Sequence, residues 1–122
     1  MTVVNVKLED FEDLVASNDI VLVDFWASWC GPCRMFAPIF ERAAEAHPEA
    51  VFAKVDTEAE VDLARAFNIM SIPTLMVFRE QVIVYAQPGA LPAASLEDLL
   101  TQVNALDMAE VHSKMGEQAA RA

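Results

Sequence analysis

Short apolar runs alternate along the chain with segments whose apolar residues recur at helical spacing. The first run is Val3–Val6, and the second, IVLVDFW at 20–26, is apolar at odd and even positions alike, as in a strand covered on both sides. VFAKVD at 51–56 forms a third run. TLMVF (74–78) and VIVYA (82–86) lie close enough together to form an antiparallel hairpin. We interpret all these runs as strands.

Helical patterns fill the segments between the strands. A helix after the first strand has its apolar positions at Leu8, Phe11, Leu14 and Val15. Another helix begins at Cys30–Cys33, and Thr57-Glu58-Ala59-Glu60 fits a capping box that starts a helix running to about Asn68. Ser95 is the expected N-cap of a last helix. The apolar stripe of that helix is Leu96, Leu99, Leu100, Val103 and Leu106.

The order β-α-β-α-β-α-β-β-α predicts an α/β fold. Strands that are joined through a helix pair in parallel, and the closing hairpin adds antiparallel strands. We therefore expect a central mixed β-sheet flanked by helices.

Length and composition indicate one soluble globular domain. The chain has 122 residues, 55% of them hydrophobic, and its apolar runs are too short to span a membrane. Residues 1–15 lack the basic start and apolar block of a signal peptide, so a cytoplasmic location is expected. Nineteen acidic against eight basic residues give a net charge of −11, which disfavours nucleic acid and anionic membranes as partners.

The two cysteines, Cys30 and Cys33, lie three positions apart within FWASWCGPCRMFAP, residues 25–38. At the start of a helix, such residues have Cβ atoms about 5 to 6 Å apart, close enough for a disulfide. A structural disulfide across so short a loop would contribute only about 2 kcal/mol, and a reducing cytosol would not maintain it. A metal site lacks further ligands, since His47 and His112 are isolated in the sequence. Reversible redox chemistry is the favoured interpretation.

The position of the pair predicts which sulfur reacts first. Cys30 precedes the helix, where free backbone N–H groups and the helix dipole stabilise an anion, and Arg34 adds a positive charge. Lowering a thiol pKa of about 8.5 by one to two units requires only about 1.4 to 2.8 kcal/mol. Cys30 is therefore the expected nucleophile, and Cys33, one turn into the helix and more sheltered, the expected resolving thiol. Pro32 restricts the backbone between them.

WCGPC (29–33), with DFW before it and SIPT (71–74) after it, resembles the active site of the thioredoxin family. The resemblance covers roughly residues 3–106 and implies a thioredoxin fold. We expect a thioredoxin domain at 1–106 and a C-terminal helical extension or tail at 107–122.

The same resemblance implies an enzyme, a thiol-disulfide oxidoreductase that reduces disulfides in client proteins through the Cys30–Cys33 pair. It implies no bound cofactor and no metal, with electrons supplied by NADPH through a thioredoxin reductase. We expect the chain to act as a monomer. The alternative is a thioredoxin-fold binding module or holdase that acts without redox turnover.

Several other site residues follow from the resemblance. Asp24 matches the family carboxyl credited with proton transfer to Cys33, and burial in its apolar strand would raise its pKa; the alternative is a strand end at the surface. Lys54 matches the lysine near that carboxyl, with a solvated strand face as the other possibility. Pro73 matches the cis-proline facing the cysteines, and Ile72 would offer backbone hydrogen bonds to a client. The implied docking surface is Trp29, Gly31, Pro32, Ile72, Pro73 and Gly89.

Three segments depart from the family pattern. The hairpin turn, Arg79-Glu80-Gln81, has no glycine, so a different turn or a bulge is expected. Pro88 stiffens the chain before Gly89. In the tail, Met108, Val111 and Met115 keep helical spacing, which favours a helix continuation or a docked tail over a partner-binding element.

Overall fold

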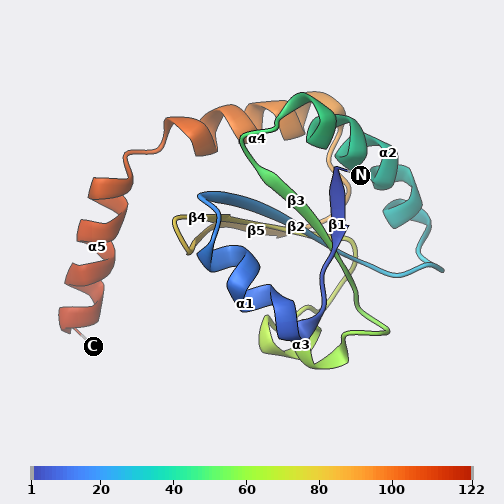
Figure 1. Ribbon diagram of the computed structural model, residues 1–122, viewed down its shortest axis with the longest axis horizontal. Coiled ribbons are helices and arrows are strands. Elements are labelled where there is room, and N and C mark those ends of the chain that lie inside the picture. The colour runs from blue at the N-terminus through green and yellow to red at the C-terminus, as the bar shows by residue number, and fades with distance from the viewer. Residues whose placement is uncertain (1, 122) are drawn as a thin grey trace.

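A five-stranded mixed sheet forms the centre of the protein in the computed structural model, which describes residues 2–121 (Figure 1). The strands are β1 (Val3–Asn5), β2 (Ile20–Trp26), β3 (Val51–Asp56), β4 (Thr74–Arg79) and β5 (Val82–Pro88). Their order across the sheet is β1-β3-β2-β4-β5. β3 pairs in parallel with β1 and β2, while β4 is antiparallel to β2 and β5. This arrangement confirms the predicted mixed sheet.

Helices cover both faces of the sheet. They are α1 (Leu8–Ala16), α2 (Gly31–Ala46), α3 (Val61–Ala66), α4 (Ala93–Ala105) and α5 (Met108–Arg121). In Figure 1, α2 and α4 lie above the sheet and α1 and α3 lie below it. None of the described helices is long and apolar enough to cross a membrane.

The apolar residues of β2 divide between two cores because successive side chains of a strand point to opposite faces. The core beneath α2 and α4 contains Ile20, Leu22, Phe36, Phe40, Phe52, Leu75, Val77, Leu96, Leu100 and Val103. The core beneath α1 and α3 contains Phe11, Val15, Val21, Val23, Phe25, Ala53, Val55, Leu63, Met76 and Phe78. By the same alternation, Asp24 lies on the face that α2 covers.

Two predicted helix starts are wrong. The N–H and the hydroxyl of Thr57 both donate to the carbonyl of Trp26, at 2.9 and 3.0 Å, which holds Thr57 at the end of β2 rather than at a helix start. Residues 57–59 form a turn, and α3 begins only at Val61. Ser95 lies inside the first turn of α4, because the carbonyl of Pro92 already accepts the N–H of Leu96 at 3.1 Å.

The β4–β5 hairpin combines a bulge with an unexpected turn. The pairing of the two strands shifts between Val77 and Phe78, in agreement with the expected bulge. The turn itself places Glu80 and Gln81 at φ values of 49° and 68°, a conformation that glycine adopts more readily. A tertiary contact supports it, since the N–H of Glu80 donates to the carbonyl of Asp19 at 2.8 Å.

The C-terminal segment forms a separate helix rather than a continuation of α4. Leu106 is extended, with φ −60° and ψ 136°, which ends α4 and redirects the chain. Met108 is buried, and Nε2 of His112 lies 2.9 Å from Oε1 of Glu80 in the hairpin turn. Beyond these contacts α5 stands away from the sheet, past the β4–β5 hairpin (Figure 1). Met115 of this helix is exposed.

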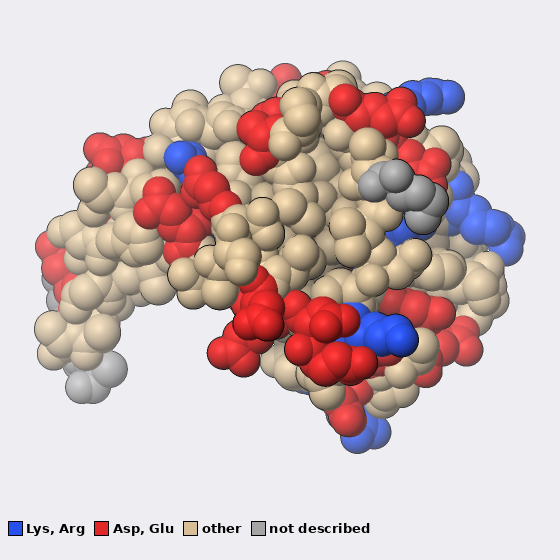
Figure 2. Space-filling view, in the orientation of Figure 1, with Lys and Arg blue, Asp and Glu red and all other residues tan. Residues whose placement is uncertain are grey.

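Acidic side chains form a cluster on one part of the surface. In the space-filling view, acidic side chains gather over α1 and α3 (Figure 2). The acidic residues of α1 are Glu9, Asp10, Glu12 and Asp13, all exposed.

Candidate active site

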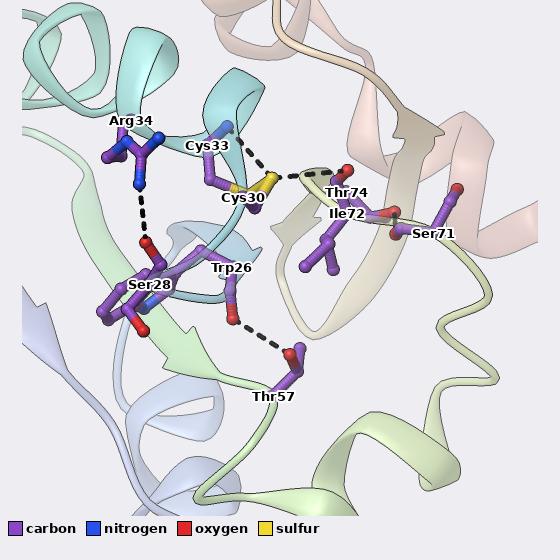
Figure 3. Close-up of a disulfide and its surroundings, with 9 residues drawn as sticks. All are labelled: Trp26, Ser28, Cys30, Cys33, Arg34, Thr57, Ser71, Ile72 and Thr74. Carbon is purple, nitrogen blue, oxygen red and sulfur yellow. Dashed lines mark hydrogen bonds between the residues drawn. A yellow bond between two sulfur atoms is a disulfide. The ribbon is translucent and has the colours of Figure 1, made fainter.

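The cysteine pair lies where the loop after β2 enters α2 (Figure 3). Cys30 is the N-cap residue, with extended backbone angles of φ −85° and ψ 113°, and its Sγ accepts the N–H of Cys33 at 3.2 Å. Pro32 fits the first turn because that position needs no N–H donor. The two sulfurs form a disulfide, with the Cα atoms 5.2 Å apart. Local helix geometry therefore places both sulfurs at the positive end of the helix dipole.

Exposure does not distinguish the two cysteines. Cys30 is 4% and Cys33 is 3% exposed, so both are buried in the disulfide form and the expected difference between them is small. The guanidinium of Arg34 donates to the carbonyl of Ser28 at 3.1 Å and points away from the sulfurs (Figure 3). The end of the helix thus lies directly at Cys30, whereas the guanidinium of Arg34 bonds to a backbone carbonyl.

The segment around Pro73 faces the cysteines. The Ile72–Pro73 peptide bond is cis, and Sγ of Cys30 lies 3.8 Å from the carbonyl oxygen of Ile72. The hydroxyl of Thr74 donates to the carbonyl of Ser71 at 2.6 Å and closes the turn (Figure 3). The fold thus brings residues 71–74 against the cysteine pair, forty positions away in the sequence.

Gly89 joins this site through its backbone. Its N–H donates to the carbonyl of Pro73 at 2.8 Å, and its φ of +105° favours glycine. Trp29 is 67% exposed. Pro32 and Gly89 are also exposed, whereas Ile72 is half-buried and Pro73 is buried. The residues expected in a docking surface lie around the disulfide, and Trp29 presents an exposed indole ring there.

Asp24 is fully buried in the middle of β2, which excludes the alternative of a surface strand end. Its neighbours in register are Lys54 on β3 and Leu75 on β4. No hydrogen-bond partner among residues 2–121 reaches either carboxyl oxygen. Burial raises the pKa of Asp24 from 3.8 to about 7, and the positive charge of Lys54 lowers it by a smaller amount. The carboxyl therefore titrates near neutral pH.

Lys54 is half-buried beside Asp24 on the same side of the sheet. Its Nζ lies 4.9 Å from the ring centroid of Trp26, within range of a cation–π interaction. In the described part of the chain no ion pair within 4.0 Å joins Lys54 to Asp24. Lys54 also lines a recess of about 520 Å³ together with Glu41 and Glu45. The lysine acts on Asp24 through its field rather than by direct contact.

The histidines contact carboxylates outside this site. Nε2 of His47 lies 2.6 Å from Oε2 of Glu97, and His112 contacts Glu80. Within residues 2–121, no group of three or more His, Cys, Asp or Glu side chains is placed to hold a metal.

Comparisons with known proteins identify the family. The Thioredoxin family model matches residues 2–102. The chain belongs to the thioredoxin family. It is 57% identical over 119 residues to "Putative thioredoxin 2" of Streptomyces coelicolor, covering 98% of this chain and 89% of that protein. A solved mutant thioredoxin of Halobacterium salinarum superposes with a TM-score of 0.79 and 34% identity, over 85% of this chain and 92% of that one.

A further relative combines two activities in its name. The bifunctional thioredoxin reductase/thioredoxin of Mycobacterium leprae is 40% identical over 99 residues, covering 77% of this chain and 22% of that protein. Family membership and the Cys30–Cys33 pair at disulfide distance make this chain a thiol-disulfide oxidoreductase that reduces protein disulfides. The predicted family, fold and activity are confirmed.

The sequence pattern did not draw attention to Met70, which lies between α3 and the Ile72–Pro73 bond and is 86% exposed. The available signal was an apolar residue that belonged neither to the stripe of the preceding helix nor to the following strand.

Proposed function

We propose that Cys30 is the attacking thiolate and Cys33 the resolving thiol. The Cys30 thiolate attacks one sulfur of a client disulfide and forms a mixed disulfide, and the other client sulfur leaves as a thiolate. Cys33, as a thiolate, then attacks Sγ of Cys30 and expels the first client sulfur. Two electrons pass to the client, which takes up two protons, and Cys30–Cys33 is left as a disulfide. The observation that carries this assignment is the N-cap position of Cys30, whose Sγ accepts the N–H of Cys33.

Asp24 is the proposed acceptor of the Cys33 proton in the second step. The support is a buried carboxyl on the sheet face beneath α2, with a pKa of about 7. A general base is most effective when its pKa is near the operating pH. In this proposal Lys54 tunes the pKa of Asp24 through its charge.

The proposed docking surface for client proteins consists of residues around the disulfide, some with exposed side chains and some that contribute backbone groups. The surface comprises Trp29, Gly31, Pro32, Ile72, Pro73 and Gly89. The exposed indole of Trp29 supports its role in client contact, and the approach of the Ile72 carbonyl to Cys30 places backbone groups beside the reacting sulfur. An extended client segment would pair with that backbone.

NADPH is the proposed source of electrons, delivered by a separate thioredoxin reductase that converts the Cys30–Cys33 disulfide back to the dithiol. The bifunctional relative supports this partner, because its name joins the two activities in one chain. Such a cycle needs a reducing compartment, so we propose the cytoplasm. We also propose a monomer as the active form, since one chain supplies every residue of the site described above.

An insulin-reduction assay tests this function. The protein is assayed first with dithiothreitol and then with NADPH and a thioredoxin reductase. Precipitation of the reduced insulin B chain is expected in both, with NADPH consumed in the second. Activity in the dithiothreitol assay combined with no activity in the assay with NADPH and the reductase would contradict the proposed partner. A Cys30→Ser/Cys33→Ser variant that still supports growth of a strain lacking the protein would favour the binding-module alternative.

A further inference from the structure

A shallow apolar groove lies beside the disulfide, between Trp29 and the segment 69–72. Its volume is about 360 Å³, and Thr57 and Ala64 complete its lining. We call it the Trp29–Met70 groove after its two exposed large apolar side chains, which are 67% and 86% exposed.

The lining of the Trp29–Met70 groove carries no charge. The chain has nineteen acidic and eight basic residues, yet every residue that lines this groove is apolar or a neutral Ser or Thr. Covering an exposed apolar side chain such as Met70 stabilises a complex in proportion to the apolar area that the partner buries. The groove therefore favours apolar over polar occupants.

The groove is continuous with the redox site. Trp29 directly precedes Cys30, and the carbonyl of Ile72, another lining residue, lies 3.8 Å from Sγ of Cys30. A client segment that is bonded to that sulfur and pairs with the Ile72 backbone, as proposed above, lies against these groups. Because an extended chain rises about 3.3 Å per residue, the side chain two positions from the client cysteine lies about 6.6 Å along the chain on the same face.

We propose that Met70 is a specificity-determining residue, which selects client segments that carry an aliphatic or aromatic side chain two residues from the reacting cysteine. This inference rests on the proposed attack by Cys30. Methionine is unbranched and flexible, so it adapts to apolar side chains of different shape. The groove should thus accept client side chains of many shapes, provided that they are apolar.

Two synthetic peptides test the inference. Each carries one cysteine as a mixed disulfide with 2-mercaptoethanol, and they differ only in having Leu or Gln at both positions two residues from the cysteine. Neither side chain is charged, so the net charge of −11 does not bias the comparison. Small changes in a hydrophobic contact alter kcat/KM by at least about tenfold, so the wild type should reduce the Leu peptide with a kcat/KM higher by that factor or more.

Met70→Ser should bring the ratio of the two kcat/KM values close to one, mainly by slowing reduction of the Leu peptide. Met35→Ser is the matched control, because Met35 is 73% exposed but does not line the groove, and its ratio should equal that of the wild type. Bis(2-hydroxyethyl) disulfide, which has no flanking side chain, serves as the reference for the redox step.

Three results would overturn the proposal: a wild-type ratio near one, an equal loss of ratio in Met35→Ser, or an equal proportional loss for both peptides and the reference disulfide in Met70→Ser. If the wild type reduces none of the three compounds, the proposed function itself is refuted. The two failures are therefore distinguishable.

Discussion

Among the described residues, the sheet face beneath α1 and α3 buries apolar side chains and the neutral Thr74, whereas the face beneath α2 also buries the carboxyl of Asp24. On the first face, Phe11, Phe25 and Phe78 surround Phe67, with ring centroids 5.2 to 6.1 Å from its own. On the second face, a carboxyl lies in the same strand with no hydrogen-bond partner among residues 2–121. Strand β2 carries both Phe25 and Asp24, because successive side chains of a strand point to opposite faces.

The difference shows that one strand can stabilise the fold with the side chains on one face and place a titrating group on the other. Apolar burial on the α1/α3 face stabilises the fold at any pH. Burial of Asp24 stabilises only the protonated carboxyl and opposes its ionisation, which is what raises its pKa to about 7. The folded state therefore becomes less favourable as that carboxyl ionises, in return for a proton acceptor near neutral pH.

Truncation on the apolar face should have the largest effect on stability. Phe25→Ala should lower the free energy of unfolding by about 3 to 5 kcal/mol, because it leaves a cavity beside Phe67. Urea unfolding measures the loss, and Phe25→Leu, expected to lose less than about 1.5 kcal/mol, is the variant to use if the alanine form does not fold. Disulfide reduction per folded molecule should stay as in the wild type. A loss of activity greater than the loss of folded protein would contradict the claim that the α1/α3 face contributes to stability and not to catalysis.

Asp24→Asn should have the opposite effect on stability at high pH. The folded pKa of about 7 lies above the unfolded value of 3.8, so the contribution of Asp24 to wild-type stability is fully present below about pH 4 and is lost as pH rises to about 7. The shift corresponds to roughly 4 kcal/mol. In urea unfolding, the stability of the variant relative to the wild type should therefore increase by up to that amount between pH 4 and pH 8. A constant difference across this range would contradict the raised pKa.

The same variant should reduce disulfides more slowly at neutral pH, because it lacks the proposed proton acceptor. Turnover equal to that of the wild type at every pH from 6 to 9 would show that Asp24 does not accept the proton.

Lys54→Met tests how the charge of Lys54 affects the pKa of Asp24. Removing the positive charge that lowers the pKa of Asp24 should raise that pKa further, so the midpoint of the pH–rate profile should move to higher pH. Lys114→Met, on the remote helix α5 where Lys114 pairs with Glu110 at 3.0 Å, is the control and should leave the midpoint unchanged. A shift to lower pH in Lys54→Met would refute the role of its field.

The smallest effect is expected from α5, which covers neither face. A chain that ends after Leu106 should lose about 1 to 2 kcal/mol of stability, mainly from the buried Met108, and should keep its reductase activity. Thermal melting and insulin reduction measure the two quantities. A tenfold loss of activity with an unchanged melting curve would assign α5 to the functional site.

The strands and the redox pair followed from the sequence because each has a local cause. The run at 20–26 matches β2 residue for residue, since apolar side chains on both faces leave few alternatives to a central strand. Cys30 as the N-cap followed from the helix pattern after it. Asp24 was identifiable as buried because a single carboxyl interrupts an apolar strand.

The remaining features depend on tertiary contacts that no local pattern encodes. The hydroxyl of Thr57 could cap a helix by sequence but bonds to Trp26 in the fold. The left-handed turn at Glu80 is supported by the carbonyl of Asp19, sixty-one positions earlier. The nearly equal exposure of the two cysteines and the position of Met70 beside Trp29 likewise arise only once the segment 69–72 packs against the active-site loop.

The central claim, that Cys30 attacks and Cys33 resolves, is tested most directly by trapping mixed disulfides with the two single variants. Cys33→Ser retains the thiol at the helix N-cap but cannot expel a bound client, because a hydroxyl does not supply the second thiolate. Mixed with disulfide-bearing proteins and run on non-reducing gels, Cys33→Ser should accumulate stable adducts through Cys30, while Cys30→Ser should trap almost none. Equal trapping by the two variants, or trapping mainly by Cys30→Ser, would contradict the account.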